Sequence, residues 1–572
     1  MTERLAFLWP EIALFLTTCV VMVLGLSRSA GTRRATPVVA GLGVLVSLYL
    51  AIATTPGTTP GVCPITGTRF TPAATAASGQ LLLPDMVPYA KTVIAGVGLL
   101  LLMLLAGVVD RSEEAQIASG KRVFDPLRSN AAEFYSFYLF SLTGLMLCAG
   151  ADDLVWLFLA LELTSLPTYI MVTVSTARNA SREAGVKYFF LGALGAAMFL
   201  YGFALIYGGT GTTRLNEIAM IFREQGIGTL PMAGVLLALL GMGFKIAAVP
   251  MHFYTADVYQ GAASPVSAFL AFVPKTAGFL GILLLCATAG WSYDFAGSGS
   301  RLLSGEAAVQ TPWGSRLPEQ VRLLLWVVAA LTMTVGNVLA ILQGSVKRTL
   351  AYSSIAHSGY MLVGVIAGPA DGSFARSGVA AVLFYLAAYG VMNTGAFAAI
   401  AMLERSPGRD GEAREIDSWD DLRGLCATHP RAGWTLVVCA LSLLGLPPLL
   451  GFFGKLPLFT SGIHAGEIVL VVVLGVNSAI AAFYYLRLAF LPLTEPADTT
   501  AEPVAAAPFR SRSLAGLLAA AGVIVIGIAG GWLMRASETA SGGKPVVDDT
   551  PEAIGPATPP HGGGPAVTPR HE

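Results

Sequence analysis

The stretch LPMAGVLLALLGMGFKIAAVP, residues 230–250, contains a single charged residue, Lys245, and ends in a proline. About 20 apolar residues in a helix span about 30 Å, the thickness of the hydrocarbon core of a bilayer. A charge within such a segment is costly, and Pro250 removes a backbone hydrogen-bond donor close to it. The stretch therefore predicts a membrane helix that is interrupted beside a functional lysine.

Apolar segments of this kind recur along the whole chain of 572 residues. Hydrophobic residues make up 54% of the sequence and charged residues only 12%, whereas a soluble domain carries about 25% charge. The apolar runs are continuous rather than alternating, which favours helices over a membrane barrel. We therefore predict an all-α polytopic membrane protein with about 14 transmembrane helices.

Several classes of function are not indicated by the sequence. The net charge is zero, so nothing points to nucleic acid. The chain contains no glycine-rich nucleotide motif, and its six cysteines show no CxxC or metal-ligand spacing. We expect no cofactor and no metal to be bound by this chain.

Basic residues are distributed unevenly between alternate loops. The loops after the odd-numbered predicted helices hold 19 lysines and arginines, against 11 in the other loops and the termini. By the positive-inside rule, both termini are expected on the outer side of the membrane. The predicted organisation is an N-terminal three-helix segment over 1–110, two larger units over 131–290 and 320–493, a C-terminal helix over 513–534 and a disordered tail over 537–572.

Of the 35 lysines and arginines, the five that are not assigned to loops or termini are all lysines, although the chain has 27 arginines and only eight lysines. These five are Lys91, Lys187, Lys245, Lys275 and Lys455. Arginine keeps its proton at accessible pH, whereas the pKa of a lysine falls readily when its ammonium group is desolvated. The pattern predicts lysines that exchange protons. The alternatives are a structural ion pair, or snorkelling at a helix end, which is the favoured interpretation for Lys91.

Glu162 is the acidic residue that stands out within a predicted helix, in DDLVWLFLALELTSLPTYIMV, residues 152–172. It lies about 14 Å into that helix. A carboxylate at this depth must be neutral or paired, and Lys245 is its expected partner. The alternative is a static bridge that only fixes helix packing.

Two predicted helices carry matched interruptions. The first breaks at Pro250, after Lys245, and the second, over 431–453, breaks at Pro447 and Pro448, before Lys455. Backbone groups freed at membrane depth need water or protein partners, so each break predicts a hydrated pocket beside a lysine. The two breaks are about 200 residues apart, and corresponding positions of the two units are offset by five helices. Because five is an odd number, the second unit is predicted to be an inverted copy of the first.

Two histidines belong to the same regions. His252 follows the first break, and His357 lies in a predicted helix with Ser353, Ser354 and Tyr360. Either histidine is a candidate proton relay near neutral pH or a packing residue with satisfied hydrogen bonds.

Five motifs stand out along the chain: LALELTSLPTYIM (159–171), GFKIAAVPMHFYTADVYQGA (243–262), FVPKTAGF (272–279), AYSSIAHSGYMLVG (351–364) and GLPPLLGFFGK (445–455). With these motifs the chain resembles the antiporter-like membrane subunits of respiratory complex I, over about residues 80–495. Within that group it resembles the N-type subunits, because Lys275 lies in VPKTAGF, a lysine ends GFFGK, and there is no long lateral helix.

This resemblance implies two inverted five-helix repeats, helices 4–8 and 9–13, with helices 7 and 12 broken. It implies proton translocation within an NADH:quinone oxidoreductase of a bacterial inner membrane, next to other membrane subunits. NADH, FMN, iron–sulfur clusters and quinone are then expected in other subunits. The implied roles are Glu162 and Lys245 as the charged pair, Lys275 as the central relay, Lys455 on the exit side, and Lys187, His252 and His357 as further relay positions.

Two other functions stay open at this stage. One is a subunit of a Na⁺/H⁺ antiporter complex or of a membrane-bound hydrogenase, and the other is a structural subunit without a proton path. The loops near 56–80, 291–318 and 405–430 and the tail are longer than the family pattern requires and are left without an explanation.

Overall fold

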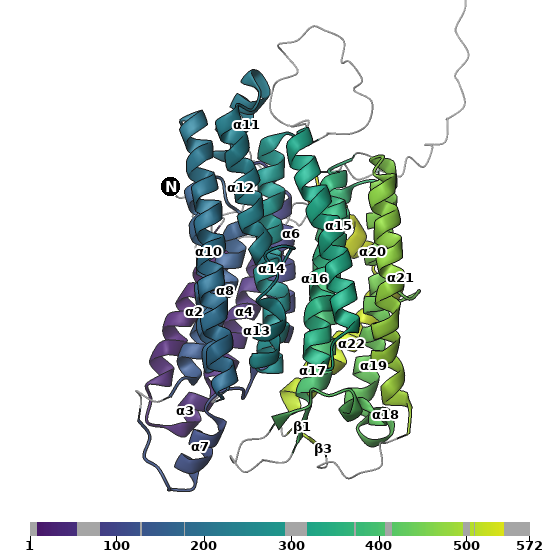
Figure 1. Ribbon diagram of the computed structural model, residues 1–572. Helices are drawn as coiled ribbons and strands as arrows, with labels where there is room; N and C mark the ends of the chain where they lie inside the picture. Colours follow the sequence, from purple (N-terminus) through teal and green to yellow (C-terminus); the bar gives the residue numbers. More distant parts are fainter. Residues whose placement is uncertain are drawn as a thin grey trace, which may run out of the picture.

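The computed structural model describes residues 8–53, 81–125, 129–176, 178–291, 317–370, 373–405, 414–495, 504–507 and 509–542. These residues form a bundle of long helices that run side by side (Figure 1). The long helices are α2 (Trp9–Gly25), α4 (Thr36–Ala53), α6 (Met86–Leu105), α8 (Ala131–Ala149), α9 (Leu154–Val174), α10 (Asn179–Thr210), α12 (Thr229–Lys245), α14 (Ser264–Ala289), α15 (Glu319–Ile341), α16 (Val346–Ala367), α17 (Gly378–Ala401), α19 (Pro430–Leu444), α20 (Leu450–His464), α21 (Ile468–Phe490) and α22 (Arg510–Ala529).

Short elements connect and flank these helices. They are α3 (Ala30–Arg34), α7 (Arg111–Ala118), α11 (Leu215–Gln225), α13 (Thr255–Gly261), η2 (Asp420–Leu422), α18 (Leu425–Thr428), η3 (Leu491–Leu493), α23 (Gly531–Ala540) and the strands β1 (Leu403–Arg405), β2 (Arg414–Glu415) and β3 (Val504–Ala506). The strands form an antiparallel sheet in the order β2-β1-β3. Figure 1 shows β1 and β3 at the same end of the bundle as α3, α7 and α18.

Among the described residues, eleven helices are long and apolar enough to cross a membrane, and α2, α12 and α19 are shorter apolar helices. The prediction of an all-α polytopic membrane protein is therefore confirmed. The number of 14 helices, the inverted relation of the two five-helix units and the domain limits stay predictions.

The most buried helices lie in the middle of the bundle. In the apolar stretches long enough to cross a membrane, the share of buried residues is 100% for α14, 89% for α16 and 94% for α17. The corresponding share for α10 is 39%. α14 and α16 carry Lys275 and His357, so these two polar residues are held inside protein rather than in lipid.

Both predicted interruptions are present, but their limits differ from the prediction. The helix predicted over 230–250 ends at Lys245, because the chain turns through Ala247, which has a left-handed φ of 55°. The helix predicted over 431–453 ends at Leu444 and resumes at Leu450. Gly445, with φ 94°, terminates its first half, since glycine adopts this conformation without steric cost. Lys245 is therefore the last residue of a half-helix.

The short helix α11 is amphipathic and buries the face that carries Leu215, Ile218 and Phe222. One further expectation concerns the C-terminal segment. The C-terminal helix expected over 513–534 is two helices, α22 and α23, that meet at the Gly530–Gly531 pair. The tail predicted to be disordered from 537 is helical as far as Ala540, and its remainder from 543 lies outside the described residues. Most of the loops near 56–80 and 291–318 also lie outside them.

Candidate functional site

Glu162 and Lys245 lie in contact. Glu162 is on α9, and its Oε1 atom is 3.0 Å from the Lys245 ammonium at the end of α12. The Lys245 side chain is 1% exposed and that of Glu162 is 16% exposed. Lys245 also donates a hydrogen bond to Ser165, which is one helical turn beyond Glu162 on the same face of α9. The ammonium therefore has one charged and one neutral acceptor.

A close helix crossing fixes the position of Lys245. Gly278 of α14 leaves no space for a side chain, because a Cβ atom there would lie 2.9 Å from the Lys245 Cβ and 2.7 Å from Cγ2 of Ile246. Gly278 is three residues after Lys275, on the same face of α14. The end of α12 is thus packed directly against the helix that carries the next lysine.

Lys275 is buried among neutral groups. Its ammonium donates to the Ser354 carbonyl and, at 3.0 Å, to the Ser358 hydroxyl, both on α16. The Ser358 hydroxyl donates to the carbonyl of Ile246, at 2.6 Å. Among the described residues no carboxylate pairs with Lys275. Its surroundings accept hydrogen bonds without supplying a counter-charge.

His357 joins two tyrosines at the centre of the second unit. Its Nδ1 atom is 2.5 Å from the Tyr385 hydroxyl, and its Nε2 atom is 2.6 Å from the Tyr485 hydroxyl. Tyr485 is hydrogen-bonded in turn to Ser353. A neutral imidazole donates from one nitrogen and accepts at the other, so this chain of hydroxyls and ring is able to pass a proton. Tyr360, which the sequence grouped with His357, bonds instead to Asn337.

Lys455 lies at the second helix break. Its ammonium donates to the carbonyl of Leu444, the last residue of α19, at 2.9 Å, and it lies 5.2 Å from the centre of the Tyr360 ring. A cation at the carboxyl end of a helix is stabilised by the helix dipole. Gly454, the preceding residue, packs against the Tyr385 ring, which is the hydrogen-bond partner of His357. Lys455 therefore lies next to the hydrogen-bonded group of His357, Tyr385 and Tyr485, which we call the His357 cluster.

Lys187 lies apart from the Glu162–Lys245 pair. Its side chain is 44% exposed, and its ammonium is 2.8 Å from Glu183 and 3.2 Å from Asp257. Burial raises the pKa of the Asp257 carboxyl, but Arg348 and Lys187 together hold that pKa below its usual value. Lys187 lines a polar cavity of about 390 Å³ instead of the buried site.

The cavity beside the helix break at Pro250 is apolar. A cavity of about 10 Å³ adjoins Pro250, Val249 and Met251, and it is lined by apolar residues. Such a lining offers a water few polar partners. This cavity therefore does not supply the hydrated pocket that the sequence predicts at Pro250. His252, just beyond the break, is buried, and its Nδ1 atom has no hydrogen-bond partner among the described residues.

Lys91 differs from its prediction. It does not snorkel, because its ammonium lies 2.7 Å from Glu11 of α2 and the two side chains are 2% and 4% exposed. Glu11, which lies near the start of the first helix, is not among the residues predicted from the sequence. An acidic residue at a helix end resembles an ordinary helix-terminal charge in sequence, so only the packing of α2 and α6 distinguishes it.

Several hydroxyl partners of the charged residues were also missed. Ser165 had a usable signal, because it lies three residues after Glu162 on the same helix face. No such signal marks the other partners, because each lies on a different helix from the group that it contacts. They are Ser358, which contacts Lys275, and Tyr385 and Tyr485, which contact His357.

Comparisons with known proteins place the whole arrangement in one family. Residues 151–297 and 315–481 match the family model described as NADH:quinone oxidoreductase/Mrp antiporter, TM. The chain therefore belongs to this class of membrane proteins.

Within that class, its curated relatives are N subunits. The NADH-quinone oxidoreductase subunit N of Trichlorobacter lovleyi is 39% identical over 419 residues, covering 72% of this chain and 77% of the relative. The corresponding protein of Rhodospirillum rubrum is 34% identical over 497 residues, covering 86% and 88%. The chain is thus a member of the NADH-quinone oxidoreductase subunit N family.

Solved structures agree with this assignment. A chain of respiratory complex I from Thermus thermophilus is similar with a TM-score of 0.67 and 28% identity, covering 92% of this chain and 98% of that chain. A chain of the Mrp complex from Dietzia has a TM-score of 0.67 at 21% identity and covers 93% and 97%. The second likeness concerns the fold alone.

Proposed function

We propose that this chain moves protons across a bacterial inner membrane as a subunit of an NADH:quinone oxidoreductase, with both termini on the outer side. The observation that carries the proposal is the contrast between two adjacent lysines. Lys245 has a carboxylate partner at 3.0 Å, whereas Lys275 has only neutral acceptors among the described residues. NADH, FMN, iron–sulfur clusters and quinone belong to other subunits in this proposal.

The proposed transfer begins at the charged pair. Weakening the contact between Glu162 and Lys245 removes the counter-charge that stabilises the Lys245 ammonium, and its proton then moves toward Lys275. The His357 cluster links Lys275 to Lys455, which releases a proton on the far side. Moving one charge against 100 mV requires about 2.3 kcal/mol, and one pKa unit corresponds to about 1.4 kcal/mol. A change of about two units in a lysine pKa therefore suffices, and burial and pairing supply changes of this size.

The experiment that tests the proposal is Lys245→Arg in the complete complex, reconstituted into vesicles. Arginine keeps the positive charge beside Glu162 but does not release its proton. We expect NADH-driven proton translocation to fall sharply at equal amounts of assembled complex. Lys121→Arg, at an exposed position, is the matched control. Translocation at the normal ratio to NADH oxidation in Lys245→Arg would refute the relay.

The description of the matching family, which names the Mrp antiporter beside NADH:quinone oxidoreductase, motivates a second candidate, a subunit of an ion antiporter. This candidate predicts Na⁺/H⁺ exchange in vesicles without NADH. Co-purification of the chain with an NADH-oxidising peripheral arm distinguishes the two functions.

A further inference from the structure

The segment between α17 and α19 contacts the amino end of α14. Glu415, in β2, accepts hydrogen bonds from the Ser264 backbone N–H at 2.9 Å and from the Ser264 hydroxyl at 2.7 Å. Ala263, which precedes α14, has no side chain that is able to cap the helix. The cap therefore comes from a residue 151 positions further along the chain.

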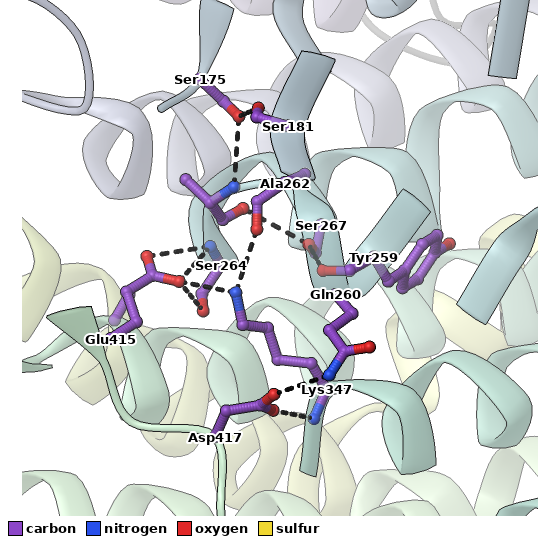
Figure 2. A network of polar contacts seen from close by, with 12 residues as sticks. Ser175, Ser181, Tyr259, Gln260, Ala262, Ser264, Ser267, Lys347, Glu415 and Asp417 are labelled. Atoms are coloured by element: carbon purple, nitrogen blue, oxygen red, sulfur yellow. Dashed lines mark hydrogen bonds and ion pairs between the residues drawn. The ribbon is translucent and has the colours of Figure 1, made fainter. Parts of the chain in front are cut away.

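The same carboxylate binds the helix that carries His357. The Lys347 ammonium, at the start of α16, lies 2.8 Å from Glu415 and also donates to the Ala262 carbonyl at 3.0 Å (Figure 2). The two charged side chains are 5% and 12% exposed. Burial raises the pKa of the Glu415 carboxyl, but Lys347 and the hydrogen bonds from Ser264 outweigh it and hold the pKa below its usual value. Glu415 therefore joins the amino ends of α14 and α16 as a charged group.

Asp417 completes the contact from the same segment. Its carboxylate accepts from the Lys347 backbone N–H at 3.0 Å and from the Ser345 hydroxyl at 2.7 Å, and its carbonyl accepts from Val346 at 2.8 Å. Residues two apart in an extended chain face the same way. One short stretch thus presents two carboxylates to two helix amino ends, where negative charge is favourable.

The contact at Glu415 and the site of Lys275 are separated by the same number of residues on both helices. Ser264 is eleven residues before Lys275 on α14, and Lys347 is eleven residues before Ser358 on α16. Both helices begin at the same end of the bundle, and eleven residues make about three turns, or about 16 Å. Eleven residues further along each helix, the hydrogen bond of 3.0 Å between Lys275 and Ser358 joins the two helices again. A shift of one helix along the other at Glu415 is therefore transmitted to Lys275.

We propose that Glu415 is a positioning residue for proton transfer, which holds α14 and α16 in the register at which Lys275 meets Ser358. The inference rests on the proposed function for its consequence in translocation, but its geometric part stands independently. Without the carboxylate, the Lys347 ammonium is buried without its counter-charge and the Ser264 N–H loses its acceptor. The amino ends of α14 and α16 then separate or slide.

The test is Glu415→Gln in the complete complex, with Asp420→Asn as the matched control. Asp420 is in the same segment, but its side chain is 81% exposed and its ion-pair partner, Arg423, is three residues away on the same short stretch. We expect Glu415→Gln to lower NADH-driven proton translocation about three- to tenfold at equal amounts of assembled complex. Glu415→Asp, which keeps the charge, should recover part of the loss, and Asp420→Asn should leave translocation unchanged.

Two further measurements separate positioning from general destabilisation. In a Ser358→Ala background, adding Glu415→Gln should cause little further loss, because the contact it positions is already absent. A structure of the Glu415→Gln complex should show a longer Lys275–Ser358 separation. If Glu415→Gln does not assemble, Glu415→Gln with Lys347→Met, which removes both charges, takes its place.

The outcomes are distinguishable. An unchanged separation, or independent losses in the double variant, would overturn the positioning role. A lengthened separation together with normal translocation in Lys245→Arg would instead refute the proposed function and leave the positioning of Lys275 intact.

Discussion

Replacing Glu162 by glutamine removes the charged group that contacts Lys245 in the described part of the chain, while keeping the size of the side chain. The two groups are 3.0 Å apart, and an effective dielectric constant of about 20 gives an attraction of about 5.5 kcal/mol. Removing one member of a buried pair costs about 3–5 kcal/mol, because the other charge stays desolvated. The charged form of Lys245 is therefore strongly disfavoured relative to its neutral form.

The assay compares NADH oxidation with proton uptake into vesicles that contain the assembled complex. We expect proton uptake per NADH to fall, because Lys245 no longer holds a proton to transfer. Glu217→Gln is the control, since Glu217 forms an exposed pair with Arg214 at 3.4 Å, and such pairs contribute little. Uptake equal to that of the wild type in Glu162→Gln would show that the pair is only structural.

Three further predictions follow from the packing and charges. Gly278→Ala should lower the melting temperature of the complex and proton translocation together, since its Cβ atom would lie 2.7 Å from Ile246, and overpacking costs about 1–3 kcal/mol; an unchanged melting curve would contradict this. Glu11→Gln should destabilise the protein by about 3–5 kcal/mol, because it removes a buried carboxylate charge that lies 2.7 Å from the Lys91 ammonium, whereas Glu11→Leu with Lys91→Met should be nearly neutral in thermal unfolding. Because the folded-state pKa of Glu415 is lowered, its stabilisation is present above the ordinary value of 4.5 and lost as pH falls through the lower folded value. The difference in melting temperature between wild type and Glu415→Gln should therefore stay constant from pH 7 to about 5 and shrink only below about 4.5; a difference that changes near pH 6 would contradict the assignment.

The sequence predicted features that depend on local composition. Continuous apolar runs predicted the helical membrane fold, and a lone carboxylate opposite a lone lysine predicted the contact between Glu162 and Lys245. The limits of the broken helices were less accurate, because the left-handed turn at Ala247 leaves no mark in an apolar sequence.

Contacts made by residues without a local signal of their own could not be predicted. Lys91 was interpreted as snorkelling because its depth was judged from its own helix, while its partner Glu11 comes from α2. The segment over 405–430 was left without an explanation, since no local pattern shows that Glu415 caps a helix that begins 151 residues earlier.

The two half-helices end in chemically different ways, and this has a consequence for control. The Lys245 ammonium faces a carboxylate, whose charge can be neutralised or drawn away, whereas the Lys455 ammonium faces the Leu444 carbonyl and the ring of Tyr360. A carbonyl dipole is fixed and does not titrate. Under the proposed function, the first unit is therefore open to electrostatic control through the charge of Glu162, whereas the partners of Lys455 keep the same charge at every pH.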